Sequence, residues 1–98
     1  MEIEETRNGN EVTLKLIGRL DTQTAPQLSE KVQSDDGDVE RLVLDMSGLE
    51  YISSAGLRVI LSLDKQMSKR GGMMVTGVSD TVMEVLEATG FTDILEIR

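Results

Sequence analysis

The stretch DMSGLEYISSAGLRVIL, residues 45–61, links the end of a predicted buried strand to the beginning of a predicted helix. The apolar run Leu42–Leu44 just before it is unbroken, as is typical of a strand covered on both faces. A Ser-Gly pair indicates a turn, so we expect a loop over residues 47–53. Ser53 and Ser54 directly precede the apolar helical pattern, where N-cap residues stand. The stretch therefore predicts a strand, a loop and a helix that begins with two adjacent hydroxyl groups.

A serine at this helix start lies among backbone N–H groups that have no helical partner, at the positive end of the helix dipole. Such a position accommodates a dianionic phosphate. We therefore hypothesise that Ser54 is a switch whose phosphorylation decides whether the protein binds a partner. On the physics of the sequence alone, the alternative is that Ser53 and Ser54 serve only as helix caps.

Composition narrows the function classes that this chain can serve. Its 98 residues are enough for one domain with an ordinary hydrophobic core. The absence of cysteine and histidine removes disulfides, thiol chemistry, the commonest general base and the usual zinc ligands. The formal net charge of −8 argues against nucleic acid or an anionic membrane surface as a partner. No glycine loop or dinucleotide motif suited to a nucleotide is present, so we expect neither a cofactor nor a metal.

Targeting signals are not evident either. No apolar run approaches the roughly 20 residues that a membrane span needs. The N-terminal sequence MEIEE is acidic and lacks the positive region of a signal peptide. We therefore expect a cytoplasmic protein.

Alternating and continuous apolar patterns divide the chain into strands and helices. Strands are predicted at residues 3–6, 11–17, 40–46, 73–78 and 94–97, with an Asn-Gly hairpin turn between the first two. Helices are predicted between residues 24 and 34, from about 55 to 69 and from about 80 to 89. The resulting order, β-β-α-β-α-β-α-β over residues 1–98, predicts a single α/β domain. We expect a mixed, largely parallel sheet of four or five strands, with an N-terminal hairpin and helices packed against it.

Polar residues and glycines mark the ends of these elements. Thr24 is expected to cap the first helix, and Ser79 or Asp80 to cap the last one, with Gly90 at its C-terminal end. The segment SDDGD, residues 34–38, is typical of a solvated break between elements. A calcium loop would need more ligands and a closing glutamate, which this segment lacks.

Two of the predicted loops should share one end of the sheet. In α/β sheets, binding sites form beyond the carboxyl ends of the parallel strands. Gly18 is expected to end the second strand, and the central strand is expected to end at Met46, so that both chains leave the sheet at the same edge. This topology would bring Asp21, Thr22 and Ser54 into one neighbourhood.

Three motifs carry a family resemblance along the chain. They are GRLDTQTA at residues 18–25, LVLDMSGL at 42–49 and YISSAGL at 51–57. In this order and spacing they resemble the STAS domain, and specifically the bacterial anti-sigma factor antagonists, whose phosphorylation segment is similar to the third motif. The segments GGMMV and ATGFTDIL lie where that family has a strand and the end of its last helix. The resemblance covers the chain essentially from end to end.

The resemblance implies a binding module and not an enzyme. In this family the unphosphorylated protein binds an anti-sigma factor, a serine kinase with a histidine-kinase-like ATPase fold, and so frees a sigma factor. The kinase phosphorylates the serine at the position of Ser54 and is thereby released, and a metal-dependent serine phosphatase restores the antagonist. The residues expected to contact the partner are Asp21, Thr22, Thr24, Ser53, Ser54, Ala55, Gly56, Leu57 and Arg58.

One position departs from the family pattern. The residue before the phosphorylated serine is commonly aspartate in this family, and this chain has Ser53 there. Two hydroxyl groups therefore stand side by side. The register of Gly56 and Leu57 favours Ser54 as the phosphorylation site, with Ser53 as the second choice.

Two other classes of function stay open. One is a STAS scaffold that is not phosphorylated and belongs to a larger signalling or lipid-transport assembly. The other is a small α/β enzyme that uses carboxylates such as Asp21 and Asp45, which would require a metal or a ligand-sized pocket at the strand ends. The sequence does not indicate whether the protein is a monomer or a dimer.

Overall fold

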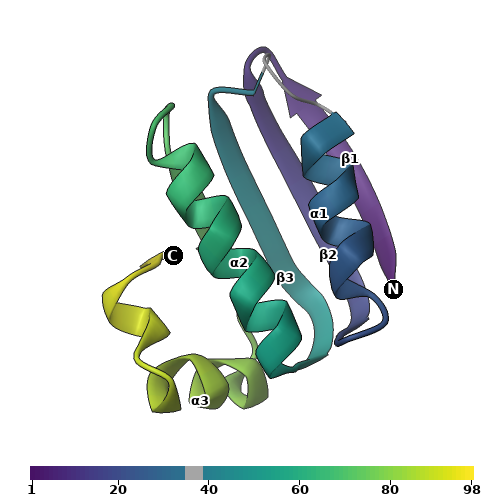
Figure 1. The fold of residues 1–98 in the computed structure, drawn as a ribbon, viewed down its shortest axis with the longest axis vertical. Coiled ribbons are helices and arrows are strands. Elements are labelled where there is room, and N and C mark those ends of the chain that lie inside the picture. Colours follow the sequence, from purple (N-terminus) through teal and green to yellow (C-terminus); the bar gives the residue numbers. More distant parts are fainter. Residues whose placement is uncertain (35–38) are drawn as a thin grey trace.

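In the computed structural model, which describes residues 1–34 and 39–98, five strands form one mixed sheet in the order β1-β2-β3-β4-β5 (Figure 1). The strands are β1 (Glu2–Asn8), β2 (Glu11–Leu20), β3 (Arg41–Ile52), β4 (Met73–Thr76) and β5 (Glu96–Ile97). The helices are α1 (Ala25–Ser34), α2 (Ser54–Met67), α3 (Asp80–Ala88) and the short 3-10 helix η1 (Phe91–Asp93). β1 is antiparallel to β2, and the other neighbouring pairs are parallel. The predicted α/β order and N-terminal hairpin are confirmed.

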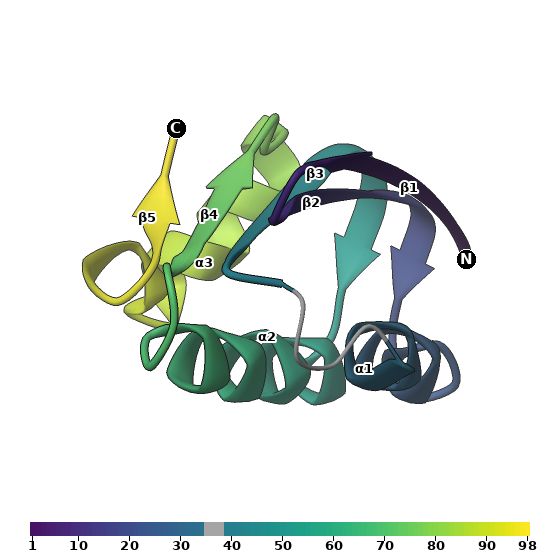
Figure 2. The same cartoon turned by 90° about the horizontal axis from the view of Figure 1, so that it is seen from above.

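Helices α1 and α2 lie side by side on one face of the sheet and run in the same direction (Figures 1 and 2). Helix α3 crosses the lower end of the sheet in Figure 1 and contacts β3. Val12, Leu14 and Leu16 of β2 are buried and alternate with half-buried side chains, as period-two patterning predicts. Within the described residues, no helix is both long enough and apolar enough to cross a membrane.

The central strand β3 is longer than the sequence predicts. The apolar run Leu42–Leu44 is buried as expected, but the strand continues through the predicted loop over residues 47–53 and ends at Ile52. Its pairing with β2 is irregular, because Lys15 pairs with Asp45 but Ile17 pairs with Gly48, so that an extra residue bulges on β3. The Ser-Gly pair therefore makes a bulge inside a strand and not a turn between elements.

Strand β2 is also longer than predicted. Gly18 has a φ of +107° but still pairs with Leu49, and the pairing continues up to Leu20. A second register shift lets Leu20 and Ile52, the last paired residues, both lie inside the core. The prediction that Gly18 ends the strand is therefore wrong, because a glycine with positive φ is compatible with a bulged strand.

Smaller differences occur at other element ends. Strand β4 ends at Thr76, because Gly77 takes a φ of +68° that leaves the strand conformation. Helix α2 ends at Met67, whose carbonyl accepts the N–H of Gly72 at 2.9 Å. Of the predicted last strand, residues 94–97, only Glu96–Ile97 pairs with β4, because η1 precedes it.

Helix α3 resolves the alternative between two caps. Ser79 is the N-cap, and its Oγ accepts the N–H of Val82 at 3.3 Å, whereas Asp80 is the first helical residue. Gly90, at a φ of +80°, follows the last turn as predicted. The predicted solvated break at residues 34–38 cannot be compared beyond Ser34, since residues 35–38 lie outside the described residues.

Gly56 lies in close contact with the strand ends beneath the first turn of α2. A Cβ built on this residue would lie 2.8 Å from Cγ of Leu20 and 3.0 Å from its carbonyl oxygen. It would also lie 3.1 Å from Cγ1 of Ile52. The first turn of α2 can therefore approach the paired strand ends only because position 56 has no side chain.

We predict that Gly56→Ala lowers the free energy of unfolding by about 1–3 kcal/mol, as in other overpacked cores. An ordinary helical Gly→Ala change would instead stabilise the chain by roughly 0.5–1 kcal/mol. Urea unfolding measures the effect, with Ser62→Ala on the exposed side of α2 as the control. A Gly56→Ala protein as stable as the wild type would show that the helix shifts away from Leu20 at no cost.

Candidate functional site

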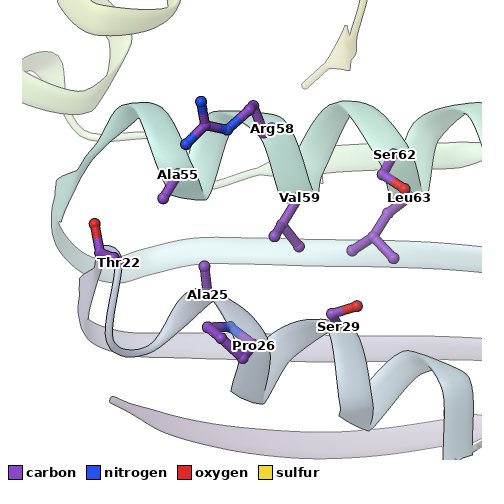
Figure 3. Close-up of a pocket in the computed structure, with 9 residues that line it drawn as sticks. All are labelled: Thr22, Ala25, Pro26, Ser29, Ala55, Arg58, Val59, Ser62 and Leu63. Carbon is purple, nitrogen blue, oxygen red and sulfur yellow. The ribbon is translucent and has the colours of Figure 1, made fainter.

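The carboxyl ends of β2 and β3 bring two loops together. Leu20 pairs with Ile52 at the end of the ladder, and the N–H of Ser53 donates to the carbonyl of Leu20 at 2.9 Å. The loop that follows β2 and the first turn of α2 therefore lie side by side, as the topology predicts. Figure 3 shows Thr22 facing Ala55 across this junction.

The two serines at the start of α2 have different environments. Ser53 is the N-cap: its Oγ accepts the N–H of Gly56 at 3.4 Å and its carbonyl accepts the N–H of Leu57 at 2.9 Å. Ser54 is the first helical residue and is exposed. Among the described residues, the Ser54 side chain has no hydrogen-bond partner. Ser53 is therefore engaged in holding the helix end, whereas the Ser54 hydroxyl is accessible to a second protein.

Asp21 and Thr24 form a reciprocal hydrogen-bonded box in the loop before α1. Oδ1 of Asp21 accepts the N–H groups of Gln23 and Thr24 at 3.0 and 3.1 Å. Oγ1 of Thr24 accepts the N–H of Asp21 at 2.9 Å and donates to the carbonyl of Arg19 at 2.7 Å. Thr24 directly precedes α1, as predicted, and its carbonyl accepts the N–H of Leu28 at 3.4 Å, but its hydroxyl is occupied within the loop. The side chain with capping geometry is that of Asp21.

This box makes Asp21 a stronger acid. The backbone N–H of Thr24 is the main cause that lowers the pKa of Asp21 below its ordinary value of 3.8. Desolvation opposes the effect, while the N–H of Gln23, the Thr24 hydroxyl and the Arg19 guanidinium add to it. Nε of Arg19 lies 3.9 Å from Oδ2 of Asp21, and its guanidinium also lies over the Tyr51 ring at 4.3 Å from the centroid.

A groove of about 360 Å³ runs between α1 and α2 and begins at the junction of the two loops (Figure 3). Its lining is mostly small or apolar and consists of Thr22, Ala25, Pro26, Ser29, Ala55, Arg58, Val59, Ser62 and Leu63. Arg58 supplies the only charge in this set. We name this feature the α1–α2 groove.

The structure separates the predicted contact residues into two groups. The accessible group consists of the exposed Thr22, Ser54 and Arg58 and the half-buried Asp21, Thr24, Ser53 and Ala55. Of these, Thr22, Ala55 and Arg58 line the groove. Gly56 and Leu57 are buried, so they position α2 and present little surface.

The sequence analysis did not predict several residues of the groove, although the helical spacing of three of them was visible in the sequence. Val59 and Ser62 fall four and seven positions after Ala55, which places all three on one face of a helix. The pairing of Arg19 with Tyr51 has no such signal, because it depends on the second register shift between β2 and β3.

The two carboxylates of the enzyme alternative, Asp21 and Asp45, lie at different positions along the sheet. Asp45 lies in the middle of β3, in register with Lys15 and Thr76, and its Oδ1 accepts the N–H of Ser47 at 2.9 Å. Asp21 follows the far end of the neighbouring strand. In the part of the chain that the structure describes, no group of three acidic residues is placed to hold a metal ion.

Sequence comparisons identify relatives of the whole chain. The sequence profile of the STAS domain matches residues 2–98. BtrV of Bordetella bronchiseptica, named as an anti-sigma factor antagonist, is 39% identical over 85 residues, covering 84% of this chain and 72% of BtrV. The anti-sigma-B factor antagonist of Listeria monocytogenes is 32% identical over 102 residues, covering 100% of this chain and 87% of that protein.

Solved structures share the fold. An anti-sigma factor antagonist structure from Thermotoga maritima has a TM-score of 0.88 at 24% identity, covering 97% of this chain and 84% of that one. The phosphorylated form of the Bacillus protein SpoIIAA has a TM-score of 0.76 at 18% identity, covering 99% of this chain and 91% of that one.

The different environments of the two serines predict different stability effects. Ser53→Ala removes the cap and should lower the free energy of unfolding by about 0.5–1 kcal/mol. Ser54→Ala removes no hydrogen bond and should change it by less than about 0.5 kcal/mol. Urea unfolding at neutral pH compares the two variants, and an equal or larger loss in Ser54→Ala would contradict the assignment of the cap.

Asp21 predicts an acid dependence of stability. Because folding lowers its pKa, the carboxylate stabilises the folded chain above the unfolded value near 3.8, and this contribution is lost as the pH falls through the folded value. We expect a carbon-13 carboxyl titration to place the pKa of Asp21 below 3.8. Asp21→Asn should remove this part of the pH dependence of unfolding. A titration at or above the ordinary value would disprove the box.

Proposed function

The chain belongs to the STAS domain family, and from its anti-sigma factor antagonist relatives we propose that it is an antagonist whose binding is switched at Ser54. Unphosphorylated, it binds an anti-sigma factor in the cytoplasm and so releases a sigma factor. The anti-sigma factor is a serine kinase with a histidine-kinase-like ATPase fold, and phosphorylation of Ser54 ends the complex. A serine phosphatase restores the binding form.

The observation that carries this proposal is the exposed and unbonded hydroxyl of Ser54 beside a neighbour that is already committed to the helix cap. A kinase transfers the γ-phosphoryl group of ATP to this oxygen: the new O–P bond forms, the bond to ADP breaks and the hydroxyl proton passes to a base of the kinase. This chain supplies only the acceptor oxygen, so it is a substrate and a binding module. The solved phosphorylated form of SpoIIAA supports the view that this fold accepts such a modification.

Phosphorylation changes the surface and leaves the fold in place. A phosphate adds about −1.5 to −2 charge and three acceptor oxygens. At the start of α2 it meets the positive end of the helix dipole, so the helix need not unfold. In an interface built over the same turn, it would place a bulky anion against desolvated groups at a cost of several kcal/mol. Affinity then falls by roughly two or more orders of magnitude, since each 1.4 kcal/mol or so is tenfold.

The test uses a serine kinase of the anti-sigma factor class from the same organism, ATP and mass spectrometry. We expect wild type and Ser53→Ala to gain one phosphoryl group and Ser54→Ala to gain none. Unphosphorylated wild type and Ser54→Ala should bind the kinase equally, whereas the phosphorylated wild type should bind at least about 100-fold more weakly.

Two outcomes would contradict the proposal. A phosphoryl group that persists in Ser54→Ala and maps to Ser53 would move the site to the neighbouring residue. Absence of modification in all three proteins, with binding retained, would instead indicate a STAS scaffold that is not phosphorylated.

A further inference from the structure

We propose that Arg58 is the cation through which the α1–α2 groove and Ser54 are coupled, an inference that rests on the proposed function. In the unphosphorylated chain, the groove holds an apolar segment of the anti-sigma factor, and Arg58 pairs with an aspartate or glutamate that flanks this segment. In the phosphorylated chain, the phosphate on Ser54 takes Arg58 instead. The switch would then remove the ionic anchor of the partner in addition to adding repulsion.

The lining of the groove favours a partner of this chemistry. Pro26, Ala55 and Val59 present apolar surface along its walls, whereas Ala25 and Leu63 are buried beneath it, which leaves space for apolar side chains of another protein. Arg58 is the only charged residue of the lining. The whole chain carries 18 acidic and 10 basic residues, so a partner carboxylate is repelled by most of the molecule and attracted at this rim.

Arg58 also has no partner of its own among the described residues. Other arginines are paired within the chain: Arg19 with Asp21, Arg41 with Glu11 and Glu96, and Arg98 with Glu96. By contrast, Arg58 is exposed and makes neither an ion pair nor a hydrogen bond in the part that the structure describes. Its planar guanidinium, with five N–H donors, suits two-point binding of a carboxylate or a phosphate.

The position of Arg58 on α2 places it within reach of Ser54. The two residues are four apart in one helix, where Cβ atoms lie about 5–6 Å from each other. Figure 3 shows the Arg58 side chain running back along the helix toward Ala55, the residue that follows Ser54. A phosphate on Ser54 can therefore accept hydrogen bonds from this guanidinium without a change of the backbone.

The intramolecular half of the proposal can be tested without any partner. Phosphoserine is placed at position 54 of the full chain by genetic encoding, and the side-chain Nε–H signal of Arg58 is followed by proton–nitrogen NMR. We expect this signal to shift downfield and its hydrogen exchange to slow in the phosphorylated chain, with no such change in Ser54→Ala. An Arg58 signal that is the same in the phosphorylated and the unphosphorylated chain would show that the phosphate does not bind Arg58.

The intermolecular half is tested by titrating variants with the same serine kinase. We expect Arg58→Gln to weaken binding of the unphosphorylated chain by about tenfold and Arg58→Glu to weaken it further. Lys65→Gln, which removes an exposed cation of α2 outside the groove, is the matched control and should leave affinity unchanged. Exchange of one aspartate or glutamate of the kinase for lysine should restore binding to Arg58→Glu.

The outcomes separate this inference from the proposed function. If encoded phosphoserine abolishes binding while Arg58→Gln binds as wild type does, the switch stands and the role of Arg58 is wrong. If the phosphorylated chain binds as tightly as the unphosphorylated one, the proposed function itself fails. A dimer of this chain that dissociates in Arg58→Glu would assign the groove to a second copy and overturn the choice of partner.

Discussion

The parallel pairing of β2 with β3 up to Leu20 and Ile52 is the constraint on which the site depends. This pairing makes the two strands end side by side, and the hydrogen bond from the N–H of Ser53 to the carbonyl of Leu20 links the segments that follow them. The missing side chain of Gly56 then allows α2 to lie directly against these strand ends. The serine that begins the helix is consequently held at a defined place beside the β2–α1 loop.

Around this junction, each polar residue has a distinct task. Asp21 and Thr24 use their hydrogen bonds on each other and on the loop backbone, which gives the loop a fixed shape. Ser53 uses its hydroxyl on the helix end. Ser54 and Arg58 keep exposed side chains, and Arg58 lines the groove. The surface available to a partner is thus assembled from the groups that the fold does not need.

Much of this arrangement could be predicted from the sequence. The order of elements, the parallel sheet behind a hairpin and the meeting of the two loops follow from apolar periodicity and α/β topology. The length of β3 could not be predicted, because a Ser-Gly pair looks the same in a turn as in a bulge. The difference lies in its pairing partner, Ile17, which is distant in the sequence.

The hydrogen bonds of the polar side chains could not be predicted from the sequence either. Thr24 is a plausible cap by its type and place, and only the reciprocal bonds with Asp21 show that its hydroxyl is used elsewhere. The choice between Ser53 and Ser54 depended on family register, since both stand at a helix start. Hydrogen bonding distinguishes them on physical grounds, because one oxygen is engaged and the other is exposed.

If Ser54 is phosphorylated as we propose, the separation of its outward oxygen from the capping oxygen of Ser53 affects the rate at which the protein can switch. Phosphorylation of the Ser54 oxygen leaves the Ser53 oxygen bonded to the helix end. No slow conformational change therefore has to follow the phosphoryl transfer. The rate of switching would then be set by the kinase and the phosphatase alone. The response of the cell would be given by the ratio of phosphorylated to unphosphorylated protein. Each molecule could be switched many times without unfolding.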